Sequence, residues 1–356
     1  MTEMESKKIP KAVALLSGGL DSTLAILVMK RLGVEVTAIT FLTHFGCDIS
    51  DSSSCSRNPF PAAEKFGFKV KLSHLADKFI EIVKKPEHGH GRNMNPCIDC
   101  RILMLKEAGE FMRMTGADFL ITGEVLGQRP MSQRKETFPL IDKASGMAGY
   151  VLRPLSAKLL KPTVAETSGL IDRESLYNFS GRSRKPQMKL AEEFGLDDYP
   201  NPAGGCLLTE PNYAWRLKEL LTFTPNPTLR ELGLLRLGRH FRPSAQSPVK
   251  IIAGRDKGEN NELEKLIGPN DIYMRAEDHK SPIVLITGAD NYDKELIDLA
   301  ASICARYSDS KNQPSVKIII FSGEKPAASV DAAPAKDALL DALRIQKPEK
   351  GRKVKS

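Results

Sequence analysis

The feature that most constrains this chain is a stretch near its amino end, residues 12–29, where an apolar run meets two glycines and then a second apolar run. Residues 13–16 are typical of a buried strand, and residues 24–29 have helical spacing. A strand that turns tightly into a helix leaves the first backbone N–H groups of that helix without partners, and the helix dipole favours an anion there. Gly18 and Gly19 allow close backbone approach to a phosphate, because they carry no Cβ. The stretch therefore predicts a phosphate-binding turn.

Polar side chains surround the two glycines. Ser17, Ser22 and Thr23 offer hydroxyl donors, and Asp21 can cap the helix or hold a magnesium ion. The loop is not a Walker A sequence, because no Gly-Lys-Ser/Thr follows it. Ser-Gly-Gly-Leu-Asp-Ser at 17–22 instead resembles the pyrophosphate-binding loop of the PP-loop ATP pyrophosphatases.

That resemblance implies ATP and Mg²⁺ as cofactors. It also implies cleavage of ATP between its α and β phosphates, with AMP moving to a substrate oxygen and pyrophosphate leaving. An ordinary glycine-rich turn is the structural alternative. A match over six residues at a strand–helix junction argues against it.

Composition and charge narrow the classes of protein. A net charge of +8 and a pI near 9.0 suit a polyanionic partner. Six cysteines in a chain without the apolar core of a signal peptide favour metal or redox chemistry over a disulfide framework. Because no apolar run approaches the roughly 18 residues that span a bilayer, we expect a cytoplasmic protein with no membrane partner.

The order of apolar segments predicts an α/β domain with a parallel sheet flanked by helices. A strand at 35–42 completes a βαβ unit, and further strands are expected at 68–72, 118–122 and 150–155. Ligands of such sheets lie at the carboxyl ends of the strands. We therefore expect the following residues near the nucleotide: Thr40 and Phe41 beside the adenine, Gly123 at the same edge, and Lys161 and Arg153 at the α-phosphate.

Three cysteines form the second candidate site. Cys97 and Cys100 lie three apart at the predicted start of a helix, where the dipole favours thiolates, and Cys206 follows two glycines in a tight turn. Other metal patterns are weaker: Cys47 and Cys55 fit no familiar spacing, and His88 and His90 stand between glycines in a predicted loop.

Asn95-Pro96, Cys100 and the Gly116-Ala117-Asp118 to Thr122-Gly123 segment resemble the tRNA thiouridine synthetases of the PP-loop group over roughly residues 10–220. The members that use a persulfide carry an Asp where this chain has Cys97. Cys97, Cys100 and Cys206 instead match relatives that bind a [4Fe–4S] cluster through three cysteines, which leaves one iron open for sulfur. A Cys100/Cys206 persulfide pair and a zinc site are the alternatives, although zinc would normally want a fourth ligand.

A second domain is expected after a linker at 224–228. Strands at 234–242, 249–256, 271–275, 283–287 and 316–321, with helices after 259 and at 295–306, predict a smaller α+β fold. Gly238-Arg239-His240-Phe241, Gly254-Arg255-Asp256 and Asp271-Ile272-Tyr273 together resemble the RNA-binding domain of the NFACT proteins. A solvated basic strand face is the alternative.

The predicted domains are thus residues 1–225 for ATP binding and tRNA thiolation, 226–325 for RNA binding, and 326–356 as a basic disordered tail. The resemblance implies an ATP-dependent tRNA sulfurtransferase that adenylates a uridine carbonyl and replaces its oxygen with sulfur. Catalytic roles fall to Asp21, Cys97, Cys100 and Cys206. Its partners would be tRNA and a sulfur donor, either free sulfide or a sulfurtransferase protein, and a homodimer is one option for its assembly.

Two other classes of function stay open at this stage. One is a PP-loop amide ligase, which would need an ammonia source rather than three cysteines. The other is a non-catalytic RNA-binding protein with a relic loop, against which the intact Ser17, Gly18, Gly19, Asp21 and Ser22 argue.

Overall fold

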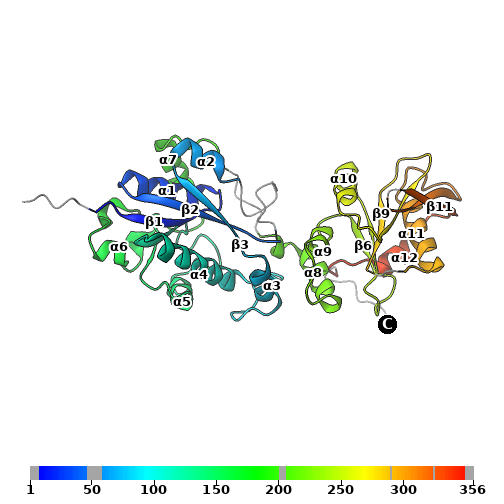
Figure 1. The fold of residues 1–356 in the computed structure, drawn as a ribbon, viewed down its shortest axis with the longest axis horizontal. Helices are drawn as coiled ribbons and strands as arrows, with labels where there is room; N and C mark the ends of the chain where they lie inside the picture. The colour runs from blue at the N-terminus through cyan, green and yellow to red at the C-terminus, as the bar shows by residue number, and fades with distance from the viewer. Residues whose placement is uncertain (1–7, 46–57, 200–205, 289–290, 324, 349–356) are drawn as a thin grey trace, which may run out of the picture. The chain divides into compact units, whose positions relative to one another are not determined.

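The structure is a computed structural model, and it describes residues 8–45, 58–199, 206–288, 291–323 and 325–348. Cys47 and Cys55 lie outside these residues, as do the two glycines that precede Cys206. The chain divides into two compact units, residues 1–209 and 210–356 (Figure 1).

The first unit is built on a parallel sheet, as the sequence predicts. Its strands are β1 (Lys11–Leu15), β2 (Glu35–Leu42), β3 (Lys69–His74), β4 (Phe119–Thr122) and β5 (Val151–Leu152), in the order β3-β2-β1-β4-β5. Every neighbouring pair is parallel. The predicted α/β class is therefore confirmed. The fifth strand is shorter than the predicted 150–155.

Helices cover both faces of this sheet. Figure 1 shows α1 (Leu20–Arg31), α2 (Phe60–Phe66) and α7 (Lys185–Glu193) on one side, with α4 (Cys97–Thr115) and α5 (Thr137–Ala144) on the other. The remaining helices are α3 (Ala76–Lys84) and the single turn α6 (Val164–Thr167). Leu24, Ile26 and Val28 of α1 are fully buried in the core.

The strand order fixes where a ligand can bind. From β1 the chain builds β2 and β3 on one side, then crosses to place β4 and β5 on the other side of β1. Connections that leave in opposite directions from a central strand open a crevice at its carboxyl end, and this is where open α/β sheets bind ligands. The loop 16–19 between β1 and α1 lies at that point.

The second unit contains an antiparallel sheet of six strands. The strands are β6 (Arg239–Phe241), β7 (Lys250–Ala253), β8 (Ile272–Ala276), β9 (Val284–Thr287), β10 (Val316–Ser322) and β11 (Lys325–Ala332), in the order β11-β10-β8-β9-β7-β6. Its helices are α8 (Pro211–Phe223), α9 (Leu229–Leu234), α10 (Lys257–Lys265), α11 (Lys294–Arg306) and α12 (Asp337–Leu343). One face packs on Ala300 and Cys304 of α11, and the other on Leu234 and Leu263. The predicted α+β class is confirmed.

The boundary between the units lies earlier than the predicted one after residue 225. Helix α8, assigned to the first domain from the sequence, belongs to the second unit. Arg216 of α8 donates hydrogen bonds to the carbonyls of Leu235 at 2.9 Å and Gly238 at 3.1 Å. Glu219 of the same helix pairs with Lys250 at 2.8 Å. These bonds tie α8 to the second sheet.

Two local predictions in the second unit are wrong. The predicted strand at 234–242 begins only at Arg239, because Thr228 and Glu231 form a capping box that starts a helix at Leu229. The predicted disordered tail from residue 326 contains β11 and α12.

The sequence of β11 does not indicate a strand because β11 lies at the edge of the sheet. Among the described strands it pairs with β10 alone, and it carries Lys325, Pro326 and small side chains, so it shows little of the apolar alternation that marks a strand. Helix α12 is held by buried Leu340 and by an ion pair between Arg306 and Asp337 at 2.7 Å.

A chain that ends after residue 323 tests the role of these elements. It lacks the partner strand of β10 and the side chain of Leu340, whose burial alone contributes about 1.5–3 kcal/mol. We expect the thermal midpoint of the second unit to fall by several degrees, measured by calorimetry, while a chain that ends at residue 348 keeps its midpoint. Equal midpoints for the two truncated chains would show that β11 and α12 contribute no stability.

Candidate active site

The loop after β1 adopts the cradle that its sequence predicts. Gly18 has a φ of 70°, a conformation that favours glycine, and Gly19 caps α1 in an extended conformation. The Ser22 hydroxyl donates to the Gly19 carbonyl at 2.9 Å and accepts from the Ser17 backbone N–H at 3.3 Å. The two serine hydroxyl oxygens lie 3.2 Å apart. The structure thus brings Ser17, Gly18, Gly19 and Ser22 together around the positive end of α1.

Asp21 lies in this cradle, half-buried, among groups from distant parts of the chain. Its Oδ2 accepts a hydrogen bond from Gln128 at 3.0 Å, whereas no residue that the structure describes gives its buried Oδ1 a hydrogen bond of ordinary geometry. Burial raises the pKa of the Asp21 carboxyl, although Gln128 and the charges of Arg184 and Arg129 oppose this shift. A buried carboxylate oxygen without a donor is suited to a cation. Asp21 therefore fits the predicted role of holding Mg²⁺.

Three residues around Asp21 were not assigned a role from the sequence: Gln128, Arg184 and Gln187. Gln187 of α7 lies beside Asp21 and is fully buried, and its side chain is among the groups that lower the pKa of the Asp21 carboxyl. Arg184 stands at the N-cap of the same helix. Arg184 and Gln187 come near the loop because α7 packs beside α1.

Gly123 follows β4 and lies against the start of α1. A Cβ at Gly123 would come within 2.4 Å of the Ser22 backbone nitrogen and 2.5 Å of the Asp21 carbonyl. This predicted site residue therefore has a packing role, since it lets the carboxyl end of β4 touch the backbone of the loop.

The other residues predicted to bind the nucleotide lie in β2 and in the segment after β5. Thr40 is fully buried, and its hydroxyl donates to the Leu16 carbonyl at 2.9 Å, so it ties β2 to the end of β1. Phe41 is also buried. Lys161 is exposed, and no contact described in the structure joins it to the loop. The preceding Leu160 accepts a hydrogen bond from Arg173 at 2.8 Å.

Arg153 is engaged elsewhere in the first unit. Its guanidinium donates to Glu124 at 3.0 Å and to Asp142 at 2.7 Å, and it lies 4.1 Å from the ring centre of Phe138. The side chain is almost fully buried. Since its donors are used by two carboxylates, the expected contact of Arg153 with the α-phosphate is not supported.

The three cysteines come from two segments that the fold joins. Cys97 and Cys100 lie in the first turn of α4, which Pro96 precedes. Residues 206–209 lie against the segment just before that helix: the Asn93 side chain donates to the Thr209 carbonyl at 2.7 Å, and the Met94 N–H to the Leu208 carbonyl at 3.2 Å. All three cysteines are half-buried.

Three thiols on two adjoining segments are ligands that both zinc and a [4Fe–4S] cluster accept. Four-coordinate zinc would normally want a fourth ligand, whereas a cluster held by three cysteines keeps one iron open. In the described part of the chain, Glu87, His88 and Asp99 have ligand atoms within 4.8 Å of one another.

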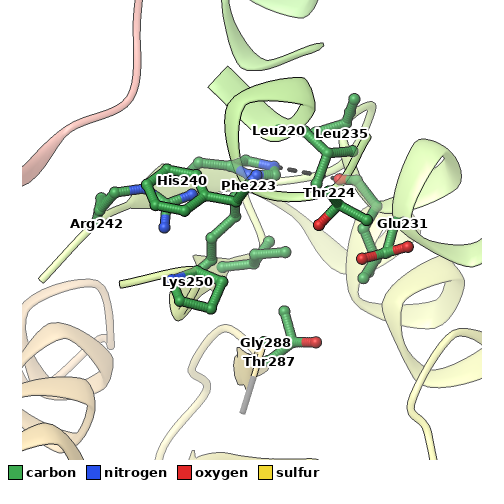
Figure 2. Close-up of a pocket in the computed structure, with 13 residues that line it drawn as sticks. Leu220, Phe223, Thr224, Glu231, Leu235, His240, Arg242, Lys250, Thr287 and Gly288 are labelled. Carbon is green, nitrogen blue, oxygen red and sulfur yellow. Dashed lines mark hydrogen bonds between the residues drawn. The ribbon is translucent and has the colours of Figure 1, made fainter. Parts of the chain in front are cut away.

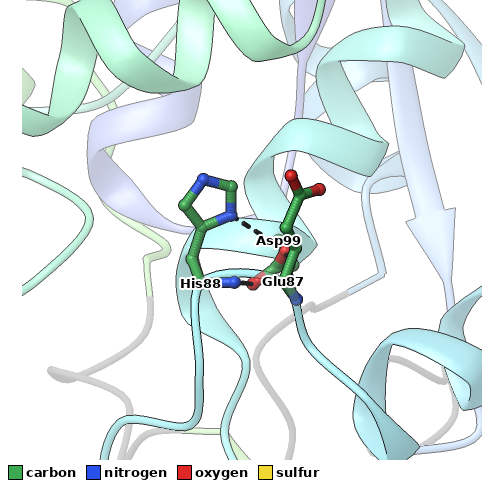
Figure 3. A group of neighbouring side chains, drawn as sticks. All are labelled: Glu87, His88 and Asp99. Carbon is green, nitrogen blue, oxygen red and sulfur yellow. Dashed lines mark hydrogen bonds and ion pairs between the residues drawn. The ribbon is translucent and has the colours of Figure 1, made fainter.

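Asp99, between the two cysteines of α4, anchors the loop that precedes the helix. Its carboxylate accepts hydrogen bonds from the backbone N–H groups of Glu87 at 3.2 Å and His88 at 3.1 Å, and its Oδ1 lies 3.0 Å from His88 Nδ1 (Figure 3). His90 Nε2 lies 2.8 Å from the Val83 carbonyl. These contacts give His88 and His90 a structural role, because they hold the loop that precedes α4 in place.

Family models match both units. Residues 8–169 match the model described as thiamine biosynthesis protein (ThiI), and residues 238–343 match the NFACT protein RNA binding domain. Residues 8–169 are thus similar to a ThiI-type PP-loop domain, and residues 238–343 to an NFACT-type RNA-binding domain. Both resemblances predicted from the sequence are confirmed.

Relatives of known name support this assignment. The chain is 30% identical over 154 residues to a probable tRNA sulfurtransferase of Thermococcus kodakarensis, covering 41% of this chain and 36% of the relative. It is 24% identical to a tRNA-specific 2-thiouridylase MnmA of Syntrophus aciditrophicus, over 65% and 61% of the two chains. A further MnmA, from Polynucleobacter asymbioticus, is 23% identical over 86% and 85%. The chain thus spans about a third of the first relative and about three-fifths of the second.

Two solved structures are similar to parts of the chain. A 4-thiouridine synthetase in complex with RNA and ATP matches 52% of each chain at 22% identity, with a TM-score of 0.34. The C-terminal part of a fibronectin/fibrinogen-binding protein from Streptococcus suis matches 76% of this chain and 97% of that one at 14% identity, with a TM-score of 0.27.

The helices that the structure describes include none with the length and apolar character of a membrane span.

Gly123→Ala tests the packing of the loop. The added methyl group would overlap the backbone of Asp21 and Ser22, and neither can move without moving the start of α1. We expect ATP affinity to fall at least tenfold, and the free energy of unfolding by about 1–3 kcal/mol. Gly233→Ala is the control, because its Cβ would meet only Leu266 at 3.5 Å. Unchanged ATP binding in the Gly123 variant would show that the close approach of Gly123 to the backbone of Asp21 and Ser22 does not shape the nucleotide site.

Proposed function

We propose that this chain is an ATP-dependent tRNA sulfurtransferase, which adenylates a uridine carbonyl oxygen and replaces that oxygen with sulfur. Residues 1–209 would carry the chemistry, and residues 210–356 would bind the RNA. The observation that carries the proposal is that one domain holds both a PP-loop and three cysteines on two adjoining segments of the chain. An amide ligase would need the first feature but not the second.

Each part of the loop between β1 and α1 would have a role in the first step, the adenylation of uridine. The backbone of Gly18 and Gly19 and the hydroxyls of Ser17 and Ser22 would hold the β and γ phosphates at the start of α1. The uridine oxygen attacks the α phosphorus, and pyrophosphate leaves. Asp21 would keep a magnesium ion on the phosphates.

Arg129 and Arg184 would add positive charge to this site. Both lie close enough to Asp21 to affect its pKa, and a triphosphate carries more negative charge than one metal ion offsets. Gln128 and Gln187 would orient the Asp21 carboxylate between them.

The second step replaces the activated oxygen. A sulfur nucleophile attacks the uracil carbon, the C–O bond breaks, and AMP leaves with the former uridine oxygen. Free sulfide or a sulfur-carrying protein would supply the sulfur. Cys97, Cys100 and Cys206 would hold a [4Fe–4S] cluster, and when bound it would offer an iron without a protein ligand as a place for sulfur.

The proposed substrate is tRNA. The match of residues 238–343 to an RNA-binding family model supports an RNA partner, as do the names of the relatives and the net charge of +8. A base must leave its stack before the loop can adenylate it, which costs a few kcal/mol. Contacts of the second domain with the rest of the RNA would offset that cost.

Asp21→Asn tests the first step. The substitution keeps the shape of the side chain and its bond partner Gln128 but removes the charge that would hold magnesium. We expect pyrophosphate release, measured with tRNA and ATP, to fall about 100-fold or more. Glu64→Gln, on the exposed surface of α2, should leave the rate unchanged. A normal rate in the Asp21 variant would rule out the assigned role of this loop.

The cysteines are tested by iron content and by thiolation. Protein purified without oxygen should be brown and hold about four irons per chain. Single Cys97→Ala, Cys100→Ala and Cys206→Ala changes should each remove iron and activity, whereas Cys304→Ala, in the core of the second unit, should keep both.

The alternatives give other outcomes in the same experiment. A persulfide at Cys100 and Cys206 would leave the Cys97 variant active. A colourless anaerobic preparation that still thiolates tRNA would contradict the cluster.

A further inference from the structure

The second unit contains a cavity that no part of the proposed reaction uses. It has a volume of about 300 Å³ and lies between α8, α9 and the β6–β7 end of the sheet (Figure 2). That volume is at the low end for clefts that bind small ligands, which suits a group of about one ring system. Apolar side chains of Phe223, Leu235 and Ile252 form part of its wall. Helices α8 and α9 precede the residues that match the RNA-binding family model.

His240 gives the cavity a buried hydrogen-bond acceptor. Its side chain lines the cavity and is only 1% exposed. Its Nε2 lies 2.9 Å from the Leu237 carbonyl and 3.2 Å from the Leu234 carbonyl, so this nitrogen carries the hydrogen. Burial, with the charges of Arg216 and Lys250, lowers the pKa of His240 well below its ordinary value and keeps the ring neutral. Among the described residues the bare Nδ1 has no hydrogen-bond partner, and because it has almost no accessible surface, a donor reaches it only when the lining side chains shift.

The charged groups of the cavity balance one another. Arg242 and Lys250 both line it, and both pair with Glu219, Lys250 at 2.8 Å. Glu231, also in the lining, accepts hydrogen bonds from the backbone N–H and the hydroxyl of Thr228 at 2.7 and 2.8 Å. The two cations are thus matched by two carboxylates, Glu231 in the lining and Glu219 outside it. A phosphate would meet no excess positive charge here, whereas a neutral ligand with donors and acceptors would be well accommodated.

Arg242 also offers a flat surface. Its guanidinium carbon lies 4.3 Å from the centre of the Phe223 ring, so the two planar groups are in contact. Figure 2 shows His240, Arg242 and Lys250 on one side of the cavity, with Thr224 and Glu231 on the other. Unpaired RNA bases are commonly recognised by stacking on arginine or aromatic planes together with hydrogen bonds to their edges.

We propose that this cavity binds one unpaired nucleobase of the RNA. The base would lie against Arg242 and donate an N–H to His240 Nδ1. The apolar side chains of the lining would contact part of its ring. This inference rests on the proposed RNA binding of the second domain but not on sulfur transfer. It adds a base contact to a domain whose other basic residues would serve the phosphates.

The test measures the affinity of the full chain, without ATP, for a short unstructured single-stranded RNA and for a duplex of the same sequence. Thr224→Trp fills the cavity from its edge, and Lys250→Met removes a lining donor while Arg242 keeps its pair with Glu219. Thr222→Trp is the matched control, because Thr222 is exposed in the last turn of α8, two residues before Thr224, and does not line the cavity.

We expect Thr224→Trp to weaken binding of the single strand about tenfold, a typical loss for one base contact, and Lys250→Met to weaken it in the same direction. For Thr224→Trp, which changes no charge, the factor should be the same at about 50 and 200 mM salt, since a neutral base releases no counterions. Duplex binding and the Thr222 variant should stay at the wild-type level.

Each other outcome overturns the inference. Equal affinities of wild type and both cavity variants would show that the cavity takes no base. A loss that disappears at high salt, or an equal loss for the duplex, would show a phosphate contact instead. If the wild type bound no RNA at all, the proposed RNA partner would fail as well, so the two failures are distinguishable.

Discussion

The close approach of β4 to the start of α1 is the constraint on which the candidate active site depends. Gly123 leaves no room for a side chain between itself and the backbone of Asp21 and Ser22. This contact fixes the first turn of α1 against the sheet edge at the point where the strand order reverses. The loop after β4 then carries Gln128 to Asp21. A phosphate cradle of backbone N–H groups is useful only if it is held rigidly, because it cannot adjust to the ligand without losing its alignment.

The cysteine set depends on a second long-range tie. Hydrogen bonds from Asn93 and Met94 hold residues 208–209 beside the segment that leads into α4. Asp99 adds to this from within the helix, because it fixes the preceding loop through the backbone of Glu87 and His88. The cysteines therefore belong to an ordered frame within the domain that holds the loop, as a two-step reaction on one uridine would require.

Much of this fold could be predicted from the sequence. Where a prediction from the sequence is missing or wrong, the structure gives a physical cause. The parallel sheet and the loop are encoded locally, in apolar runs and in paired glycines. The role of Gln187 could not be predicted, because only the packing of α7 beside α1 brings it to Asp21. Arg153 was misjudged, since two carboxylates distant in sequence use its donors. The edge strand β11 carries too few apolar residues to show a period of two.

The central claim is that ATP cleavage at the loop is coupled to sulfur insertion into tRNA. It is tested most directly by incubating the anaerobically purified protein with ATP, sulfide and tRNA that lacks thiouridine, then measuring nucleosides by mass spectrometry alongside AMP and pyrophosphate. The account predicts thiouridine only when ATP is present, with one AMP and one pyrophosphate formed for each sulfur inserted. Formation of AMP and pyrophosphate without any thiouridine would contradict it.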